Sequence, residues 1–217
     1  MGREVWRSSG RYVSLIVEAQ ARSMSPDELA QNVFTGILVG GYGRRLGGVE
    51  KSTLSHPQAE TFLAYLVEEF SPLTNKVVLA ARAEQVFVAK QHQVVVDDEP
   101  GQGPLSGLLG LLETATVPWC FLVACDMPRL RGEVLLRLCR DLNSGTQILV
   151  PRLDGILQPT CALYHRDLLP AFRSAYSEGI RSLTGLIARM DHDLIDIEGT
   201  LRECFTNINT EEDLLKL

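Results

Sequence analysis

One segment of the chain changes abruptly from an apolar, strand-like run into a glycine-rich and cationic loop. The segment extends from Gly36 to Lys51, and after the run it holds Gly40, Gly41, Gly43, Gly47, Gly48, Arg44, Arg45 and Lys51. Glycines have no Cβ atom, so backbone N–H groups can approach phosphate oxygens closely, while the cations supply full positive charges. The loop predicts binding of a nucleotide triphosphate, although a glycine cluster alone is also typical of a tight turn.

Two common phosphate-binding templates do not fit the spacing of this loop. A Rossmann fingerprint that begins at Gly41 needs a small residue where Leu46 stands. A Walker A loop that begins at Gly43 reaches Gly48 correctly, but its lysine should follow at once, and two other residues intervene before Lys51. The loop therefore indicates a phosphate site of another kind.

Acidic residues follow two further apolar runs. Asp97 and Asp98 come directly after one run, and Asp126 comes after another. Ligands of open α/β sheets bind at the carboxyl ends of strands, so these acids are expected beside the glycine loop, and a carboxylate there suits Mg²⁺. Asp126 alone would also fit a helix N-cap, and either Asp97 or Asp98 could face the ligand.

Short apolar runs alternate with segments of helical period from residue 36 onward. The expected strands are 36–39, 76–80, 93–96, 120–124 and 148–150, with strand-like runs at 160–164 and 194–197 where the parallel pattern is expected to break. Apolar residues recur at helical spacing within 62–70, 105–112 and 134–142. This alternation predicts an α/β fold, with a mostly parallel, twisted sheet and helices on both faces.

The first 35 residues do not join this alternation, and we interpret residues 1–35 as an N-terminal appendage. Within it, Ser25 followed by Pro26 and two acids predicts the start of a short helix. At the other end, Thr210 and Asp213 predict a capping box that opens a final helix.

Composition excludes several classes of function. The net charge of −6 argues against a surface that collects nucleic acid or anionic lipid, because such surfaces need clustered lysines and arginines. No apolar run approaches the roughly 20 residues that span a bilayer. The five cysteines form no Cys-x-x-Cys pair, and the chain begins without a secretion signal. We therefore expect a cytoplasmic protein with reduced cysteines and no membrane segment.

The glycine loop resembles the signature of molybdenum cofactor guanylyltransferases and related nucleotidyltransferases. That signature reads Leu-Ala-Gly-Gly, three residues, Arg-Met-Gly, and a short gap before a lysine. The register holds here from Leu38 without gaps, with Val39 in place of the usual Ala, Leu46 in place of Met, and Glu50 in place of the Asp that commonly precedes the lysine. The glycines and the cations keep their places.

Three further segments extend this resemblance, which covers residues 36–217. Residues 97–107 resemble the family's Asp, two residues, Pro-Gly, then Gly-Pro-Leu-Ala-Gly, and residues 125–128 match its Cys-Asp-x-Pro. Residues 207–210 resemble its closing Asn-x-Asn-Thr, although an Asx turn followed by a helix cap fits them equally.

The resemblance implies a three-layer Rossmann-like nucleotidyltransferase domain over residues 36–217. It implies transfer of GMP from GTP to the phosphate of molybdopterin or the molybdenum cofactor, with Mg²⁺ as cofactor, release of pyrophosphate, and molybdoenzyme maturation proteins as further partners. The implied nucleotide-binding residues are Leu38, Val39, Gly40, Gly41, Lys51, Asp97 and Asp126. The implied catalytic residues are Arg45, Lys51 and Asp126, the implied metal ligand is Asp126, and the implied acceptor-binding residues are Asn207 and Asn209.

The choice of nucleotide stays open in the sequence. Family members that select guanine often carry Asn after the second strand, whereas this chain reads Leu79-Ala80-Ala81-Arg82. Two alternatives therefore stand beside guanylyl transfer. One is a cytidylyl- or sugar-nucleotidyltransferase on the same fold, and the other is a nucleotide-binding adaptor without catalysis.

Overall fold

A computed structural model describes residues 24–39, 50–83, 85, 92–97, 103–215 and 217. Its central strand is β1 (Val33–Leu38), in which every residue is buried. Val33 and Ile37 belong to the hydrophobic core on one face of the sheet, and Phe34 and Leu38 belong to the core on the other. A strand that is apolar on both faces needs cover on both faces, and here helices supply it.

The sheet has a parallel half and a mixed half. β1 lies between β2 (Val77–Arg82) and β4 (Trp119–Ala124), with β3 (Gln93–Asp97) outside β2, and these four strands are parallel. Beyond β4 come β7 (Cys161–His165), β5 (Ile148–Leu153), β6 (Ile156–Leu157) and β8 (Asp193–Asp196). β7 is antiparallel to both of its neighbours, and this confirms the expected break in the parallel pattern.

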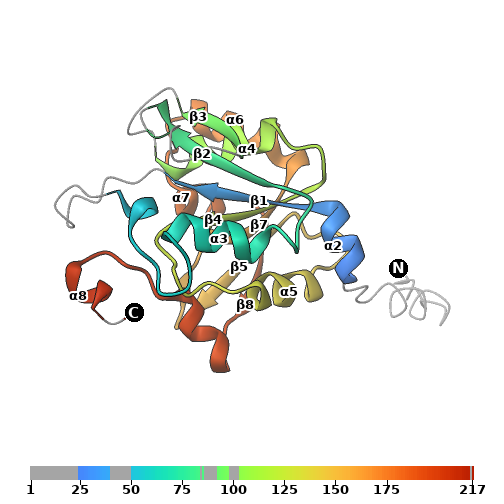
Figure 1. Ribbon diagram of the computed structural model, residues 1–217. Helices are drawn as coiled ribbons and strands as arrows, with labels where there is room; N and C mark the ends of the chain where they lie inside the picture. Colours follow the sequence, from blue (N-terminus) through green and yellow to red (C-terminus); the bar gives the residue numbers. More distant parts are fainter. Residues whose placement is uncertain (1–23, 40–49, 84, 86–91, 98–102, 216) are drawn as a thin grey trace, which may run out of the picture.

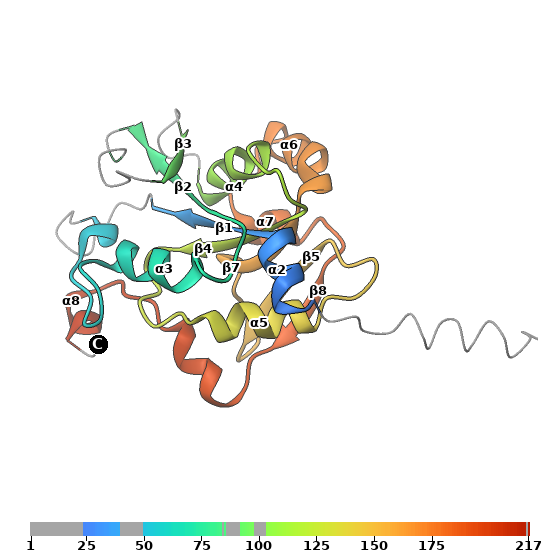
Figure 2. The same ribbon diagram turned by 45° about the vertical axis from the view of Figure 1, so that its right-hand side comes forward.

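Helices form a layer on each face of the sheet, as Figures 1 and 2 show. One layer contains α2 (Pro26–Asn32), α3 (Phe62–Phe70), α5 (Gly132–Arg140) and the 3₁₀ segment η5 (Gly199–Phe205). The other contains α4 (Pro104–Glu113), α6 (Leu169–Ser177) and α7 (Leu183–Ile187). The short elements η2 (Lys51–Thr53), η4 (Arg166–Leu168) and α8 (Glu211–Leu214) complete the described chain. The predicted three-layer α/β fold is confirmed.

The helix expected near the N-terminus is present as α2. Ser25 and Glu28 form a complete capping box at its start, and Leu29 is buried in the core beneath the sheet. β1 begins directly after α2, at Val33 rather than at Gly36. The division of the chain after residue 35 stays a prediction, and residues 1–23 lie outside the described part.

None of the helices in the described ranges is both long enough and apolar enough to cross a membrane.

Candidate functional site

The carboxyl end of β1 is fixed between its two neighbours by backbone hydrogen bonds. Val39 N–H donates to the Ala80 carbonyl of β2 at 2.9 Å, and Cys125 N–H donates to the Leu38 carbonyl at 3.2 Å. The Cys125 thiol donates to the Val39 carbonyl at 3.5 Å. The glycine loop therefore starts from a rigid point in the middle of the sheet. Three of its predicted site residues, Gly40, Gly41 and Arg45, lie outside the described residues.

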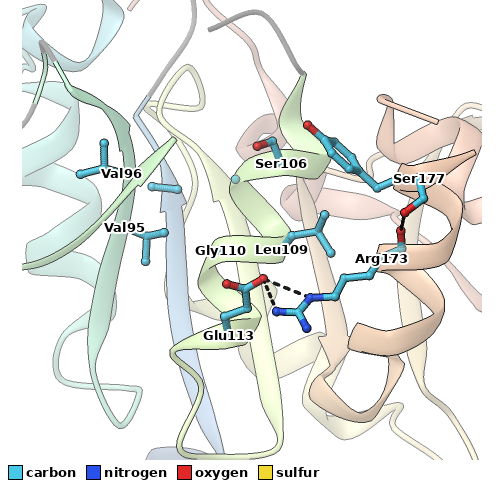
Figure 3. A pocket seen from close by; sticks show the side chains of 11 residues that line it. Val95, Val96, Ser106, Leu109, Gly110, Glu113, Arg173 and Ser177 are labelled. Atoms are coloured by element: carbon cyan, nitrogen blue, oxygen red, sulfur yellow. Dashed lines mark hydrogen bonds and ion pairs between the residues drawn. The ribbon is translucent and has the colours of Figure 1, made fainter. Parts of the chain in front are cut away.

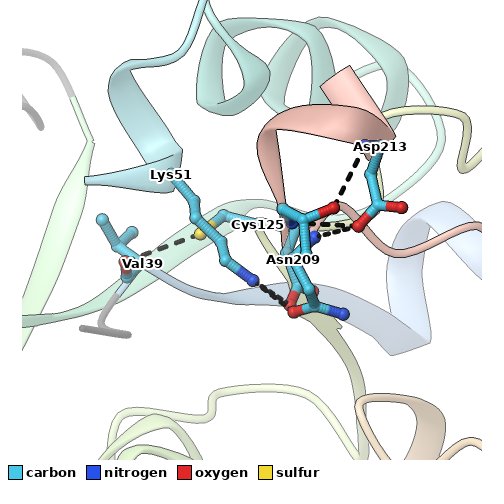
Figure 4. A network of polar contacts seen from close by, with 7 residues as sticks. Val39, Lys51, Cys125, Asn209 and Asp213 are labelled. Carbon is cyan, nitrogen blue, oxygen red and sulfur yellow. Dashed lines mark hydrogen bonds and ion pairs between the residues drawn. The ribbon is translucent and has the colours of Figure 1, made fainter. Parts of the chain in front are cut away.

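Lys51, Asp126 and Asn209 meet at this end of the sheet. Figure 4 shows the amine of Lys51 directed toward the Asn209 side chain. The Lys51 ammonium donates to Asp126 Oδ2 at 3.0 Å and to Asn209 Oδ1 at 2.7 Å. The Lys51 and Asp126 side chains keep only 13% and 26% of their surface exposed, so solvent screens their attraction only in part. Three residues that were predicted from separate motifs thus lie in one hydrogen-bonded network.

The segment that carries Asn209 is attached to the Asp126 loop through its backbone. Ile208 N–H donates to the Asp126 carbonyl at 2.9 Å. Asp213 Oδ2 accepts from both Asn209 N–H and Thr210 N–H at 2.9 Å, and Thr210 Oγ1 accepts from Asp213 N–H at 3.2 Å. The predicted capping box is therefore present, and it leaves the Asn209 side chain directed at Lys51. Asn207, by contrast, is exposed.

The carboxylate at this site suits Mg²⁺ better than it suits a metal ion whose ligands all come from the protein. Within the described ranges there is no group of three or more histidines, cysteines and acids that could hold an ion. Magnesium commonly binds through one or two carboxylates and completes its shell with water and substrate phosphates. Asp126 provides such a carboxylate at the carboxyl end of β4, so the residues fit this ion.

Cys125 contributes to the structure of the site rather than to covalent chemistry. Burial raises the pKa of its thiol to about 12, and the neighbouring Asp126 carboxylate acts in the same direction. A cysteine is nucleophilic as a thiolate, which this environment suppresses at neutral pH. Its role is to join β4 to the end of β1 through the Val39 carbonyl.

A cavity of about 420 Å³ lies beside α4, between β3 and α6 (Figure 3). One end is lined by Val96, Ser106 and Gly107, next to the position where β3 ends at Asp97. The opposite end is closed by the exposed ion pair between Glu113 and Arg173, at 2.8 Å. Val96 and the two small residues of this end suit a flat ring better than a phosphate.

Glycines on the inner side of α4 bring the helix close to the strands that form the site. A Cβ atom at Gly107 would lie 2.6 Å from Leu38 Cδ2, and one at Gly110 would lie 2.4 Å from Val95 Cγ1. α4 also begins at Gly103, which adopts φ +80° and ψ 177° as the N-cap. The sequence 103–107 therefore sets both the start of α4 and its distance from β1.

Three polar contacts in this part of the molecule escaped the sequence patterns. Arg82, at the end of β2, forms an ion pair with Glu50 at 3.2 Å and contacts Gln85, while His56 contacts the Pro128 carbonyl at 2.8 Å. A charged residue that ends a buried strand is a signal that could have singled out Arg82. No spacing pattern marks His56 or Gln85.

Comparison with known proteins gives consistent matches over this region. A family model described as the MobA-like NTP transferase domain matches residues 35–193. The molybdenum cofactor guanylyltransferase of Vibrio vulnificus (strain YJ016) is 28% identical over 179 residues, which cover 82% of this chain and 91% of that protein. The protein of the same name from Pseudomonas putida (strain GB-1) is 33% identical over 158 residues, covering 70% and 81%.

A solved structure shares the fold described above. Molybdopterin-guanine dinucleotide biosynthesis protein A from Archaeoglobus fulgidus matches with a TM-score of 0.72 and 26% identity. The match covers 84% of this chain and 95% of that chain.

Proposed function

This chain belongs to the MobA-like NTP transferase domain family, and on that premise we propose that it transfers GMP from GTP to the phosphate of molybdopterin or the molybdenum cofactor. The relatives named above carry this activity in their names and match most of the chain. The observation that carries the proposal is the contact of Lys51 with Asp126 and Asn209 at the carboxyl end of the parallel strands.

In the proposed reaction, an oxygen of the acceptor phosphate attacks the α-phosphorus of the nucleotide. A new phosphorus–oxygen bond forms, the bond to the β-phosphate oxygen breaks, and its electron pair leaves with pyrophosphate. The Lys51 ammonium offsets the growing negative charge on the phosphates, with Arg45 assigned the same task. Mg²⁺, held by Asp126, would neutralise charge on the triphosphate and help to align it.

We assign the remaining predicted residues to the two substrates. Leu38, Val39, Gly40 and Gly41 bind the nucleotide where the glycine loop leaves β1, and Asp97 binds the nucleoside. The cavity end at Ser106 and Gly107 is our candidate for the base, because these residues are small and Val96, which precedes Asp97 at the end of β3, lines the same cavity. Asn207 and Asn209 are assigned to the acceptor.

The deciding experiment measures pyrophosphate release by the purified protein with molybdopterin as acceptor. GTP, CTP, ATP and UTP are compared with Mg²⁺ present and after chelation. The proposal expects turnover with GTP that needs both Mg²⁺ and the acceptor. Turnover with CTP alone would indicate a cytidylyltransferase, and tight nucleotide binding without turnover would indicate an adaptor. The cytoplasmic location and contacts with molybdoenzyme maturation proteins stay predictions.

A further inference from the structure

A buried polar cluster joins the start of η2 to the end of β2. Its members are Glu50, Arg82 and Gln85. Arg82 Nη2 contacts Glu50 Oε1 at 3.2 Å, and Arg82 Nε donates to Gln85 Oε1 at 3.2 Å. Gln85 Oε1 also accepts from the backbone N–H of Arg82 at 3.2 Å. Arg82 is 8% exposed and Gln85 is fully buried, so the contacts are largely shielded from solvent.

Burial makes this cluster sensitive to the loss of any one member. A buried guanidinium strongly destabilises the folded protein unless a charged partner and hydrogen-bond acceptors surround it. Here Glu50 supplies the opposite charge and Gln85 supplies a neutral acceptor. Removing Glu50 alone would leave the Arg82 charge without this partner, so the two residues should act as a unit.

The direction of the Glu50 side chain ties this cluster to Lys51. Glu50 is the N-cap of η2, yet its side chain makes no capping hydrogen bond and reaches Arg82 instead. Its carbonyl accepts from Thr53 N–H at 3.1 Å and from Thr53 Oγ1 at 2.9 Å, which sets the first turn of η2. Lys51 is the next residue, and its side chain extends to Asp126 and Asn209.

We infer that Glu50, Arg82 and Gln85 position Lys51 for catalysis by fixing the start of η2 to the end of β2. Lys51 is then held at two points, with its backbone attached to β2 through Glu50 and its amine directed to the end of β4. A long lysine side chain has many rotamers, but few of them remain when the backbone is fixed and the amine is bound to Asp126 and Asn209, so less conformational entropy is lost when phosphates bind. This inference rests on the proposed nucleotidyl transfer.

The test is a double-mutant cycle between Arg82 and Lys51, measured as kcat and KM for pyrophosphate release. Arg82→Met removes the charge at similar volume and should lower kcat about 10-fold, because a slightly misplaced catalytic group loses rate. Lys51→Met should lower kcat about 10²- to 10³-fold, the scale found when one charge-stabilising donor is removed. If Arg82 acts through Lys51, the double variant should be no slower than Lys51→Met.

Two further variants and a control complete the design. Glu50→Gln keeps the shape of the side chain and should reproduce the loss of Arg82→Met. Arg82→Lys should recover only part of kcat, because a point charge can reach Glu50 but cannot also make the fork contact to Gln85. Arg152→Met removes an exposed arginine that is paired with Asp196, and it should leave kcat unchanged.

The result that would overturn the inference is additivity, in which Arg82→Met costs about 10-fold in the Lys51→Met background as well. Unchanged kcat in Arg82→Met would overturn it equally. Urea unfolding of each variant separates a general loss of folding from loss of position. If the wild-type protein releases no pyrophosphate with any nucleotide, the proposed function fails. In that case the affinity of the same variants for Mg²⁺–GTP is measured in place of kcat. The inference about Lys51 is then tested separately from the proposed function.

Discussion

The Lys51 ammonium lies between two oxygens that come from distant parts of the chain. Asp126 follows β4, whereas Asn209 precedes the last short helix, and both accept from the same nitrogen. This arrangement gives Lys51 a defined place before any substrate binds. Triphosphate oxygens can then compete for an amine that already points into the site, which lowers the cost of aligning it.

At the residue scale, Asp126→Asn should separate folding from catalysis. Asparagine has nearly the same shape, but it has no charge to hold Mg²⁺ or to pair with Lys51. We expect turnover to fall by about 10² or more, the scale of losing a single charge-stabilising contact, while the urea midpoint changes little. The measurement is Mg²⁺-dependent pyrophosphate release.

Asp141→Asn is the matched control for this prediction, because Asp141 is a partly exposed acid at the C-cap of α5 that pairs with Arg137 at 3.0 Å. It should leave turnover unchanged. Full activity of Asp126→Asn would contradict the role given to this carboxylate.

At the element scale, Gly103 determines where α4 begins. Its φ of +80° and ψ of 177° belong to a region that residues with a Cβ atom almost never adopt, and a Cβ atom would lie 2.6 Å from the Arg181 carbonyl oxygen. Gly103→Ala should therefore lower the free energy of unfolding by about 3 kcal/mol, from backbone strain together with this contact. Urea denaturation provides the measurement.

Gly155 offers a matched control for Gly103. Its φ is +79°, but a Cβ atom there would meet nothing within 4 Å. Gly155→Ala should cost about 1 kcal/mol, because only the backbone preference changes. Equal losses in the two variants would show that the approach of Arg181 to α4 contributes nothing.

His56 links the segment after η2 to the loop that follows Asp126. Gln58 N–H donates to its Nδ1 at 3.1 Å, so Nδ1 carries no proton, and Nε2 therefore donates to the Pro128 carbonyl at 2.8 Å. The ring also stacks on Tyr65, with 4.0 Å between the ring centroids. One neutral imidazole thus holds together two segments that carry site residues.

His56→Phe keeps an aromatic ring against Tyr65 and removes both hydrogen bonds. We expect the free energy of unfolding to fall by about 1–3 kcal/mol, the cost of leaving partly buried polar groups without partners. His56→Gln retains a side-chain donor for Pro128 and should recover part of this loss. Urea unfolding of the two variants is the measurement, and wild-type stability of His56→Phe would exclude a contribution from these two hydrogen bonds.

At the scale of the whole molecule, all five cysteines are buried and free. Burial raises the pKa of the Cys125 and Cys139 thiols to about 12, from an ordinary value of 9.0. These thiols stay protonated in the folded state at pH values where the unfolded chain has already lost the protons. Their contribution to stability is therefore complete below about pH 9 and is lost as the pH rises toward 12.

The resulting prediction is a fall in the free energy of unfolding between about pH 9 and pH 12, measured by urea denaturation. Cys139→Ala removes one of the titrating groups, so its stability should fall less steeply over this range than that of the wild type. Other groups also titrate here, but they contribute to both proteins, and the difference isolates Cys139. Parallel curves for the two proteins would refute the assignment.

The sequence by itself determined the elements that depend on local pattern. The alternation of apolar runs and helical stripes predicted the sheet, its two helix layers and the break at β7, because side-chain period reports which faces are buried. The spacing of the glycine loop, together with Asp126 after a buried run, predicts a site at the carboxyl ends of β1 and β4, and the role of these residues stays a prediction. The capping pattern of Thr210 and Asp213 was predicted correctly, since a helix cap is a local contact.

Only the tertiary structure decided which distant residues meet. The strand order places Asp126 beside the end of β1, and the path of the C-terminal segment brings Asn209 to Lys51. The ion pair of Glu50 with Arg82 likewise joins η2 to β2 across intervening chain. Such contacts depend on how whole elements pack, and no local propensity or spacing encodes the distance between them.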